Sequence, residues 1–472
     1  MKGRNVELQR PMKQILNWFV AVLAVFHLAN GIVLQAQGDI ADRPNIVFIM
    51  ADDLGYADLG CYGQEHIRTP HIDQMAREGL RFTQCYAGAV VCAPSRSVLM
   101  TGLHTGHTRV RGNRGKNTPP HDGQKGRIPL RLEDVTVAEL LRDAGYRTGI
   151  TGKWGLGEPG STGLPNDQGF DEWLGYLNQD HAPDYFTDFL WHNKKKRLIP
   201  ENADGQRQVY SHNLLTDFAL EFIRENRSAP FFLYVPYCIP HAKLEVPDLG
   251  IYQDEDWPED AKVCASMVTR MDRDVGRILD LLAELQIDEK TIVFFCSDNG
   301  SARGWPGIFD SCGPLRAKKG SLYDGGIRTP MIVRWPGKVP ADETSSAVWY
   351  FADFLPTAAA LAGVDAPGNV DGISIAEALF SKSPPGNLHQ RLRERFLYWE
   401  VPRKGTLRQA VRHGNWKAVR SARNRPLELY DLSNDKGETM NVADLHPDLV
   451  ETIDEYLSDC RTNSPHWPVP SR

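Results

Sequence analysis

Four oxygen-donating side chains follow two apolar runs that lie far apart in the sequence. Asp52 and Asp53 come after "NIVFIM", and Asp298 and Asn299 come after "TIVFFC". Carboxylate and amide oxygens without accompanying histidine or cysteine suit Ca²⁺ or Mg²⁺ better than zinc. Each stretch alone, "ADDLG" or "SDNGS", is also an ordinary turn. Two such stretches at matching strand ends favour a metal site.

A cysteine stands at the predicted start of a helix in "CAPSRSVLMTG". Pro94 is tolerated in a first turn and Gly102 offers a C-terminal stop, so the pattern predicts a helix from Pro94 onward. A helix N-terminus offers unpaired N–H groups, so an anion could lie against Cys92 with Arg96 one turn further in. The alternative is an inert buried cysteine before an ordinary helix.

The elements that must position these residues alternate along the chain. Apolar runs rich in β-branched or aromatic residues predict buried strands at "NIVFIM", "YRTGIT", "PFFLYVPYCIP" and "TIVFFC". Helical patterns lie between them at "HIDQMAREG", "TVAELLRDAG" and "MDRDVGRILDLLAEL". The alternation predicts an α/β fold with a mostly parallel, mixed sheet sandwiched by helices. Ligands bind such sheets beyond the carboxyl ends of the strands, where Asp52, Lys153, His241 and Asp298 would converge.

Further cationic candidates for holding an anion are Arg96, Lys153, Lys318 or Lys319, His107, His181 and His241. A single lysine or histidine is usually a surface or internally satisfied residue, so only their joint placement carries weight. The long stretches 111–127 and 182–208 lack periodicity and are predicted to be loops over the binding rim. The run "NKKKR" at 193–197 is interpreted as a solvated loop rather than a binding patch.

The character of the sequence changes near residue 385. The segments "RFLYWEV", "LRQAVRH", "NWKAVR" and "LELYDL" predict antiparallel strands, and Leu449, Ile453 and Leu457 mark a final amphipathic helix. We therefore expect an α/β domain over residues 43–384 and a smaller C-terminal α+β subdomain over residues 385–472.

The N-terminus carries basic residues followed by the apolar run "ILNWFVAVLAVFHLANGIVL". This pattern is typical of a secretory signal peptide, assigned to residues 1–38, with an uncleaved membrane anchor as the alternative. We expect a periplasmic or secreted protein. A net charge of -6 argues against a general nucleic-acid binder. The eight cysteines show no CxxC pair, so no structural zinc is expected, and disulfide pairing stays open.

Six motifs between Pro44 and Asn441 occur in a specific order: "PNIVFIMADDLGYADLGCYG", "CAPSRSVLMTGLHTGH", "GYRTGITGKWGLG", "FFCSDNG", "KKGSLYDGGIRTPMIVRWPG" and "ELYDLSNDKGETMN". In these motifs the chain resembles the type I, formylglycine-dependent sulfatases of the alkaline phosphatase superfamily. Its motifs are similar to those of bacterial arylsulfatases and polysaccharide sulfatases. The resemblance implies that Cys92 is oxidised to formylglycine, whose hydrated aldehyde is the nucleophile. It also implies a partner for this step, a formylglycine-generating or anaerobic sulfatase-maturating enzyme.

Carried over by position, the resemblance assigns a Ca²⁺ site, with Mg²⁺ as a second possibility. The implied ligands are Asp52, Asp53, Asp298, Asn299 and residue 92. Arg96 would steady the formylglycine diol, while Lys153 and Lys319 would hold sulfate oxygens. His241 would help to bind sulfate and protonate the leaving oxygen.

One position departs from the family pattern. Many members carry a histidine two residues beyond the lysine of "GKW", and here that position is Gly155. His181 or His107 is the candidate substitute. The expected substrate is a sulfated carbohydrate or an aryl sulfate. Two alternatives stay open, a phosphatase or phosphodiesterase of the same superfamily and a non-catalytic glycan-binding protein.

Overall fold

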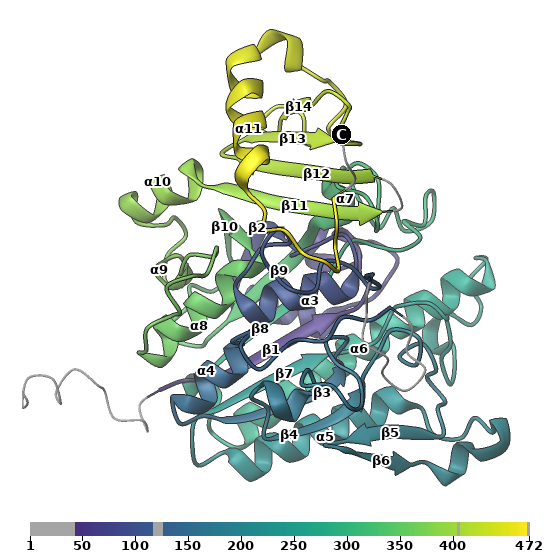
Figure 1. Ribbon diagram of the computed structural model, residues 1–472. Helices are drawn as coiled ribbons and strands as arrows, with labels where there is room; N and C mark the ends of the chain where they lie inside the picture. Colours follow the sequence, from purple (N-terminus) through teal and green to yellow (C-terminus); the bar gives the residue numbers. More distant parts are fainter. Residues whose placement is uncertain (1–42, 117–125, 404–405, 470–472) are drawn as a thin grey trace, which may run out of the picture. The chain divides into compact units, whose positions relative to one another are not determined.

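Ten strands form one mixed sheet in the computed structural model, which describes residues 43–116, 126–403 and 406–469 (Figure 1). In chain order they are β1 (Asn45–Ala51), β2 (Leu80–Tyr86), β3 (Arg147–Lys153), β4 (Glu172–Tyr176), β5 (Phe189–His192), β6 (Lys195–Leu198), β7 (Phe231–Pro236), β8 (Thr291–Ser297), β9 (Arg328–Arg334) and β10 (Glu343–Tyr350). Their order across the sheet is β10-β2-β9-β8-β1-β7-β3-β4-β5-β6. The central strands β8, β1, β7, β3 and β4 run parallel, whereas β9, β5 and β6 pair antiparallel with their neighbours. The predicted α/β fold with a mixed sheet is confirmed.

Strand β1 shows why both faces of this sheet need a cover. Its side chains alternate between two hydrophobic clusters, one holding Ile46, Phe48 and Met50 and the other Val47, Ile49 and Ala51. All seven residues of the strand are buried. A parallel strand buried on both faces reads as a continuous apolar run, which is the pattern of "NIVFIM".

Helices supply the cover on the two faces. The Phe48 cluster includes residues of α3 (Cys92–Thr101), α4 (Val137–Asp143) and α8 (Phe354–Ala362). The Ile49 cluster includes residues of α2 (Pro70–Arg77), α5 (Ser211–Asn226) and α6 (Glu259–Glu284). The three predicted helices are confirmed as α2, α4 and α6. The helix of the cysteine motif, α3, begins at Cys92 rather than at Pro94.

A second sheet lies in the C-terminal part of the chain and is antiparallel, as predicted. It contains β11 (Phe396–Arg403), β12 (Thr406–His413), β13 (Trp416–Arg420) and β14 (Glu428–Asp431), and α11 (Pro447–Asp459) packs on it through Ile453 and Leu457. Three short helices precede it: α7 (Asp324–Ile327), α9 (Ala376–Leu379) and α10 (Gly386–Glu394).

Buried polar contacts join the second sheet to the first within the unit Pro44–Arg472. Lys417 of β13 contacts two carboxylates, Asp324 at 2.7 Å and Glu438 at 3.0 Å, and Arg328 of β9 lies 3.4 Å from Asp324. We call Asp324, Arg328, Lys417 and Glu438 the anchor cluster. Because two of its members lie before residue 330 and two lie after residue 416, it ties the end of the α/β region to the C-terminal sheet.

The expectation of a loop over residues 182–208 is wrong in part, because β5 and β6 form a hairpin there, with Asn193 at its turn (φ 52°) and every residue of β6 exposed. The signal-peptide segment 1–38 and residues 117–125 lie outside the described residues. Among the described residues, no helix is long and apolar enough to cross a membrane. All eight cysteines are free thiols.

Candidate active site

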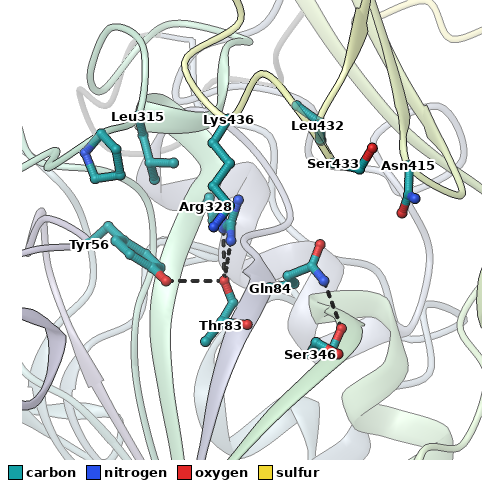
Figure 2. Close-up of a pocket in the computed structure, with 11 residues that line it drawn as sticks. Tyr56, Thr83, Gln84, Leu315, Arg328, Ser346, Asn415, Leu432, Ser433 and Lys436 are labelled. Carbon is teal, nitrogen blue, oxygen red and sulfur yellow. Dashed lines mark hydrogen bonds between the residues drawn. The ribbon is translucent and has the colours of Figure 1, made fainter.

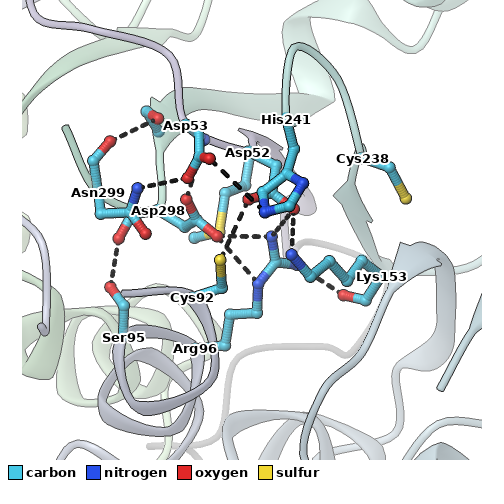
Figure 3. Close-up of polar contacts among 12 residues, drawn as sticks. Asp52, Asp53, Cys92, Ser95, Arg96, Lys153, Cys238, His241, Asp298 and Asn299 are labelled. Atoms are coloured by element: carbon cyan, nitrogen blue, oxygen red, sulfur yellow. Dashed lines mark hydrogen bonds and ion pairs between the residues drawn. The ribbon is translucent and has the colours of Figure 1, made fainter. Parts of the chain in front are cut away.

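The ends of β1 and β8 bring four oxygen-donating side chains together (Figure 3). The strands are parallel neighbours with Ala51 opposite Ser297, so the residues that follow lie side by side. The Asp53 N–H donates to Oδ1 of Asp298 at 3.2 Å, and Asn299 Nδ2 donates to Oδ1 of Asp53 at 2.7 Å. The structure therefore gathers the predicted set into one buried place: Asp52, Asp53, Asp298 and Asn299.

The chemistry of this place fits a hard divalent cation. Burial and the neighbouring Asp52 carboxylate raise the pKa of Asp298 to about 6. Oδ1 of Asn299 is buried and has no hydrogen-bond partner among the described residues. Ligand atoms of Asp52, Asp53, Cys92 and His241 lie within 4.8 Å of one another. An unpaired amide oxygen beside crowded carboxylates is the donor set that Ca²⁺ or Mg²⁺ prefers.

Cys92, the first residue of α3, points at the same carboxylates. Its Sγ lies 3.3 Å from Oδ1 of Asp52 and 3.5 Å from Nζ of Lys319. Burial, together with the charges of Asp298 and Asp52, raises the pKa of the thiol above its usual value. Burial thus favours the neutral thiol over the thiolate that nucleophilic attack requires.

Arg96 ties three strand ends together from inside α3. Its Nη2 donates to Oδ2 of Asp298 at 2.7 Å, and its Nη1 donates to the carbonyl of Lys153 at 2.6 Å. The side chain is completely buried. Burial alone would raise the pKa of Asp52, but the charges of Lys153 and His241 hold it well below its usual value. The cluster thus balances carboxylates against fixed cations.

Lys153 and His241 reach the aspartates from the ends of two further parallel strands. Lys153 closes β3, and its Nζ lies 2.5 Å from Oδ2 of Asp52. His241 follows β7, and its Nε2 lies 3.6 Å from Oδ2 of Asp53. Burial and the charge of Lys153 lower the pKa of His241. Both residues come from strand ends, as the sequence predicted.

The structure also separates the two adjacent lysines. Nζ of Lys319 lies 2.5 Å from Oδ1 of Asp53, so this lysine belongs to the cluster. Lys318 is exposed, and its Nζ donates to the carbonyl of Arg303 at 3.2 Å. We call Asp52, Asp53, Cys92, Arg96, Lys153, His241, Asp298, Asn299 and Lys319 the catalytic cluster.

Ser95 contacts the catalytic cluster, although no sequence pattern singled it out. Its hydroxyl donates to the carbonyl of Asp298 at 2.5 Å and accepts the N–H of Gly88 at 3.1 Å. The available signal was its place between Cys92 and Arg96, because a residue in the first turn of this helix faces the same strand ends. Ser95 fixes the backbone that carries two of the oxygen donors.

The two histidines considered as substitutes at Gly155 make their described contacts elsewhere. His181 Nε2 lies 2.7 Å from Oγ1 of Thr187, and burial lowers its pKa to about 4. His107 Nδ1 lies 2.9 Å from Oδ1 of Asp371, and its ring stacks on His104 with centroids 4.2 Å apart. No described contact joins either of these histidines to the catalytic cluster.

Gln179 instead fills the space beside Gly155. A Cβ at Gly155 would lie 2.4 Å from Nε2 of Gln179 and 3.9 Å from Cβ of Ala93, the neighbour of Cys92. Gly155 has φ of 85°, which a side chain would strain in any case. Oε1 of Gln179 accepts from Arg127, whereas its buried Nε2 has no hydrogen-bond acceptor among the described residues. An unpaired amide donor therefore lies beside the position at which the resemblance implies a histidine.

Comparison with known proteins now decides the family. Residues 44–364 match the family model described as Sulfatase, and residues 317–463 match the one described as N-sulphoglucosamine sulphohydrolase, C-terminal. The chain belongs to the sulfatase family. It is 33% identical to the N-acetylgalactosamine-6-sulfatase of Canis lupus familiaris, over 82% of this chain and 74% of that protein.

Two further likenesses cover most of the chain. Arylsulfatase A of Homo sapiens is 32% identical over 89% of this chain and 88% of its own length. The crystal structure of Ps i-CgsB in complex with k-i-k-neocarrahexaose superposes with a TM-score of 0.77 at 29% identity, covering 91% of this chain and 95% of that chain. These likenesses make the protein a sulfatase enzyme on an alkaline-phosphatase-like fold.

Proposed function

We propose that this sulfatase hydrolyses sulfate monoesters of a sulfated carbohydrate, with a formylglycine made from Cys92 as nucleophile and one Ca²⁺ at the oxygen donors. The observation that carries the proposal is the catalytic cluster itself. A buried cysteine at a helix N-terminus meets three carboxylates and three fixed cations there. A thiol held protonated in this way is a poor nucleophile, which supports its conversion to another group.

The residues that would hold the cation are Asp52, Asp53, Asp298, Asn299 and residue 92, with Mg²⁺ as the second fit for the same oxygens. When bound, the cation supplies positive charge against developing negative charge on sulfate. The hydrated formylglycine supplies two hydroxyl oxygens on one carbon, one to attack sulfur and one to let sulfate leave.

The remaining roles belong to side chains of the chain itself. Arg96 keeps residue 92 in place by fixing Asp298 and the end of β3. Lys153 and Lys319 donate to sulfate oxygens, because both ammonium groups already point at the centre of the site. His241 protonates the leaving oxygen. Burial lowers its pKa, and the negative charge of a bound sulfate ester acts in the opposite direction, toward the protonated form that the step needs.

Because position 155 is a glycine, the base that would deprotonate a hydroxyl of the formylglycine diol is still to be assigned. His181 and His107 remain candidates, but Gln179 lies against this position with an unpaired amide donor. An amide has no proton-accepting nitrogen at working pH, so Gln179 would orient a hydroxyl of residue 92 rather than deprotonate it. The positioning role of Gln179 therefore makes a different prediction from that of a histidine base.

A carbohydrate substrate is supported by the relatives. Ps i-CgsB was crystallised with a carrageenan oligosaccharide, and the canine relative is named for a sulfated amino sugar.

The proposal includes the organisation and the location of the chain. Residues 43–384 would form the catalytic domain and residues 385–472 the C-terminal subdomain. Residues 1–38 would direct export to the periplasm or the medium, or anchor the chain if they are not removed. A formylglycine-generating or anaerobic maturating enzyme would act on Cys92 before the helix is buried, since the folded thiol is fully enclosed.

The nucleophile is tested by Cys92→Ser. The serine oxygen can attack sulfur, and the S–O bond to the leaving alcohol breaks as that oxygen takes a proton. Release then fails, because serine has no second hydroxyl on the same carbon. We expect a single sulfation of residue 92, or no reaction, by mass spectrometry of the tryptic peptide after incubation with substrate.

Parallel measurements separate the alternatives. The wild-type peptide should carry formylglycine at residue 92 when the chain is produced with a maturating enzyme. Steady turnover by the serine variant, with phosphate esters cleaved faster than sulfate esters, would favour the phosphatase-like alternative. An unmodified Cys92 in fully active protein would refute the formylglycine assignment.

A further inference from the structure

A second cavity lies where the C-terminal sheet meets the edge of the main sheet, and we call it the C-terminal cavity (Figure 2). It has a volume of about 350 Å³. Its wall comes from β2, the first residue of β9, β10, the turn before β13 and the loop after β14. None of its lining residues belongs to the catalytic cluster. Volumes of this size are typical of sites for small ligands.

An irregularity in β2 builds the floor of the cavity. The pairing of β2 with β9 shifts register between Phe82 and Cys85, and its pairing with β10 shifts at the same level. The carbonyl of Thr83 is thereby available to accept hydrogen bonds from side chains. It accepts Nε of Arg328 at 2.8 Å, Nη2 of Arg328 at 2.5 Å and the hydroxyl of Tyr56 at 3.1 Å. These contacts hold the guanidinium of Arg328, the first residue of β9, against the floor of the cavity.

Two cations converge on this space without a carboxylate between them. The Arg328 side chain is only 7% exposed, and Lys436 extends from the rim toward it (Figure 2). Among the described residues, Lys436 has no ion pair and no side-chain hydrogen bond. No aspartate or glutamate lines the cavity, and the single acidic contact of Arg328, Asp324, is shared with Lys417. Lys436 therefore adds an unpaired positive charge to a space that no carboxylate lines, which favours an anion there.

The rim adds neutral groups that suit a sugar. Ser346, Asn415 and Ser433 are exposed lining residues, each with a hydroxyl or amide side chain. The side-chain amide of Asn415 has no described partner. Hydroxyl and amide groups around a cationic floor match a sugar unit that carries a sulfate or carboxylate group.

We propose that the C-terminal cavity is a glycan subsite that binds an acidic unit of the same sulfated chain, apart from the unit that loses sulfate. The identity of the ligand as a glycan rests on the proposed function. A second binding site for the same chain raises the affinity for long chains by effective concentration, without changing the chemical step. The cavity would thus favour oligosaccharides over small sulfate esters.

The test uses two exposed variants and a matched control. Lys436→Glu reverses the rim charge, and Asn415→Asp adds a negative charge with almost no change of shape. Lys338→Glu makes the same charge change at an exposed lysine outside the cavity. Affinities are measured by calorimetry for sulfated hexasaccharides from carrageenan, chondroitin sulfate and heparin, and for inorganic sulfate, with the full-length Ca²⁺-loaded chain that retains Cys92. Hydrolysis of 4-nitrophenyl sulfate is measured with the mature enzyme.

We expect the two cavity variants to weaken binding of the best hexasaccharide about tenfold, and Lys338→Glu less than about twofold. Hydrolysis of the aryl sulfate should stay unchanged. Unchanged hexasaccharide affinity would overturn the subsite, as would wild-type protein that binds none of the three, or inorganic sulfate bound as tightly with the same dependence on Lys436. If no sulfate ester is hydrolysed but the cavity variants still lose binding, the proposed function fails and the subsite stands.

Discussion

Two buried charge clusters in this molecule differ in how completely their polar atoms are paired. In the anchor cluster, Asp324 and Glu438 have a donor at every carboxylate oxygen. Lys417 donates to one oxygen of each carboxylate. The Tyr86 hydroxyl donates to the other oxygen of Asp324 at 2.7 Å, and the Asp324 N–H donates to the other oxygen of Glu438 at 2.6 Å. In the catalytic cluster, Oδ1 of Asn299 has no described partner.

Titration behaviour does not separate the two clusters, because burial raises the pKa of Glu438 in the anchor cluster, and Lys153 and His241 hold the pKa of Asp52 well below its usual value in the catalytic cluster. Burial opposes ionisation in both clusters, but Lys417 and Arg328 lower the pKa of Asp324 to about 2. The pKa of Asp298 is raised to about 6, because burial and Asp52 outweigh Arg96. The two clusters therefore differ in the pairing of their polar atoms rather than in burial. A cluster closed on itself holds the fold together, and a cluster that leaves a buried amide oxygen unpaired offers a ligand to a cation.

The largest effect is expected at Asp298. Asp298→Ala should lower kcat/KM on the order of 10³-fold or more, because it removes a proposed ligand of the cation and the ion-pair partner of Arg96. Bound Ca²⁺, measured by elemental analysis, should fall with it. Asp298→Asn is the matched variant, since it keeps the shape and should still unfold cooperatively. Full activity with unchanged metal content would refute the assignment.

The anchor cluster should show its effect in stability instead. Lys417→Met leaves two carboxylates buried without their shared cation, and removing one partner of a buried ion cluster costs roughly 3–5 kcal/mol. The free energy of unfolding, from urea titration, should fall by that amount. Adding Asp324→Asn and Glu438→Gln to Lys417→Met should recover part of it. If the single variant is as stable as the wild type, the anchor interpretation is wrong.

Gln179 offers a further test of the difference in pairing. Its buried Nε2, like Oδ1 of Asn299, has no hydrogen-bond partner among the described residues, and it lies close to the start of α3. If this amide orients a hydroxyl of residue 92, Gln179→Ala should lower kcat roughly 10–100-fold with a flat pH profile. His181→Ala and His107→Ala should each have a smaller effect. A larger loss in His181→Ala, with a shifted acidic limb of the pH profile, would return the role to that histidine.

The sequence predicted the catalytic cluster better than the surface around it, for a physical reason. Asp52, Lys153, His241 and Asp298 each follow an apolar run, and parallel strands place such positions at one edge. The hairpin β5–β6 escaped prediction because Lys195–Leu198 is exposed at every residue and shows no apolar alternation. Gln179 and Lys417 escaped because their partners are set by tertiary packing. Lys417 lies 93 positions from Asp324, and no local pattern marks that distance.

The smallest effect tests whether the two clusters act separately. Lys319 lies in the loop that leads to Asp324, the first residue of α7, so loosening the anchor would move Lys319 if the two were coupled. Two backbone bonds stand between them, since the Lys319 N–H donates to the carbonyl of Ser301 at 3.0 Å and the Gly320 N–H donates to the carbonyl of Val90 at 2.9 Å. These bonds fix Lys319 without help from Lys417. We therefore expect Lys417→Met, assayed well below its melting temperature and normalised to folded protein, to keep kcat/KM within about threefold of wild type, as expected for sites without shared partners. A loss of thirtyfold or more would show that the anchor positions Lys319, and that the paired and unpaired clusters form one functional unit.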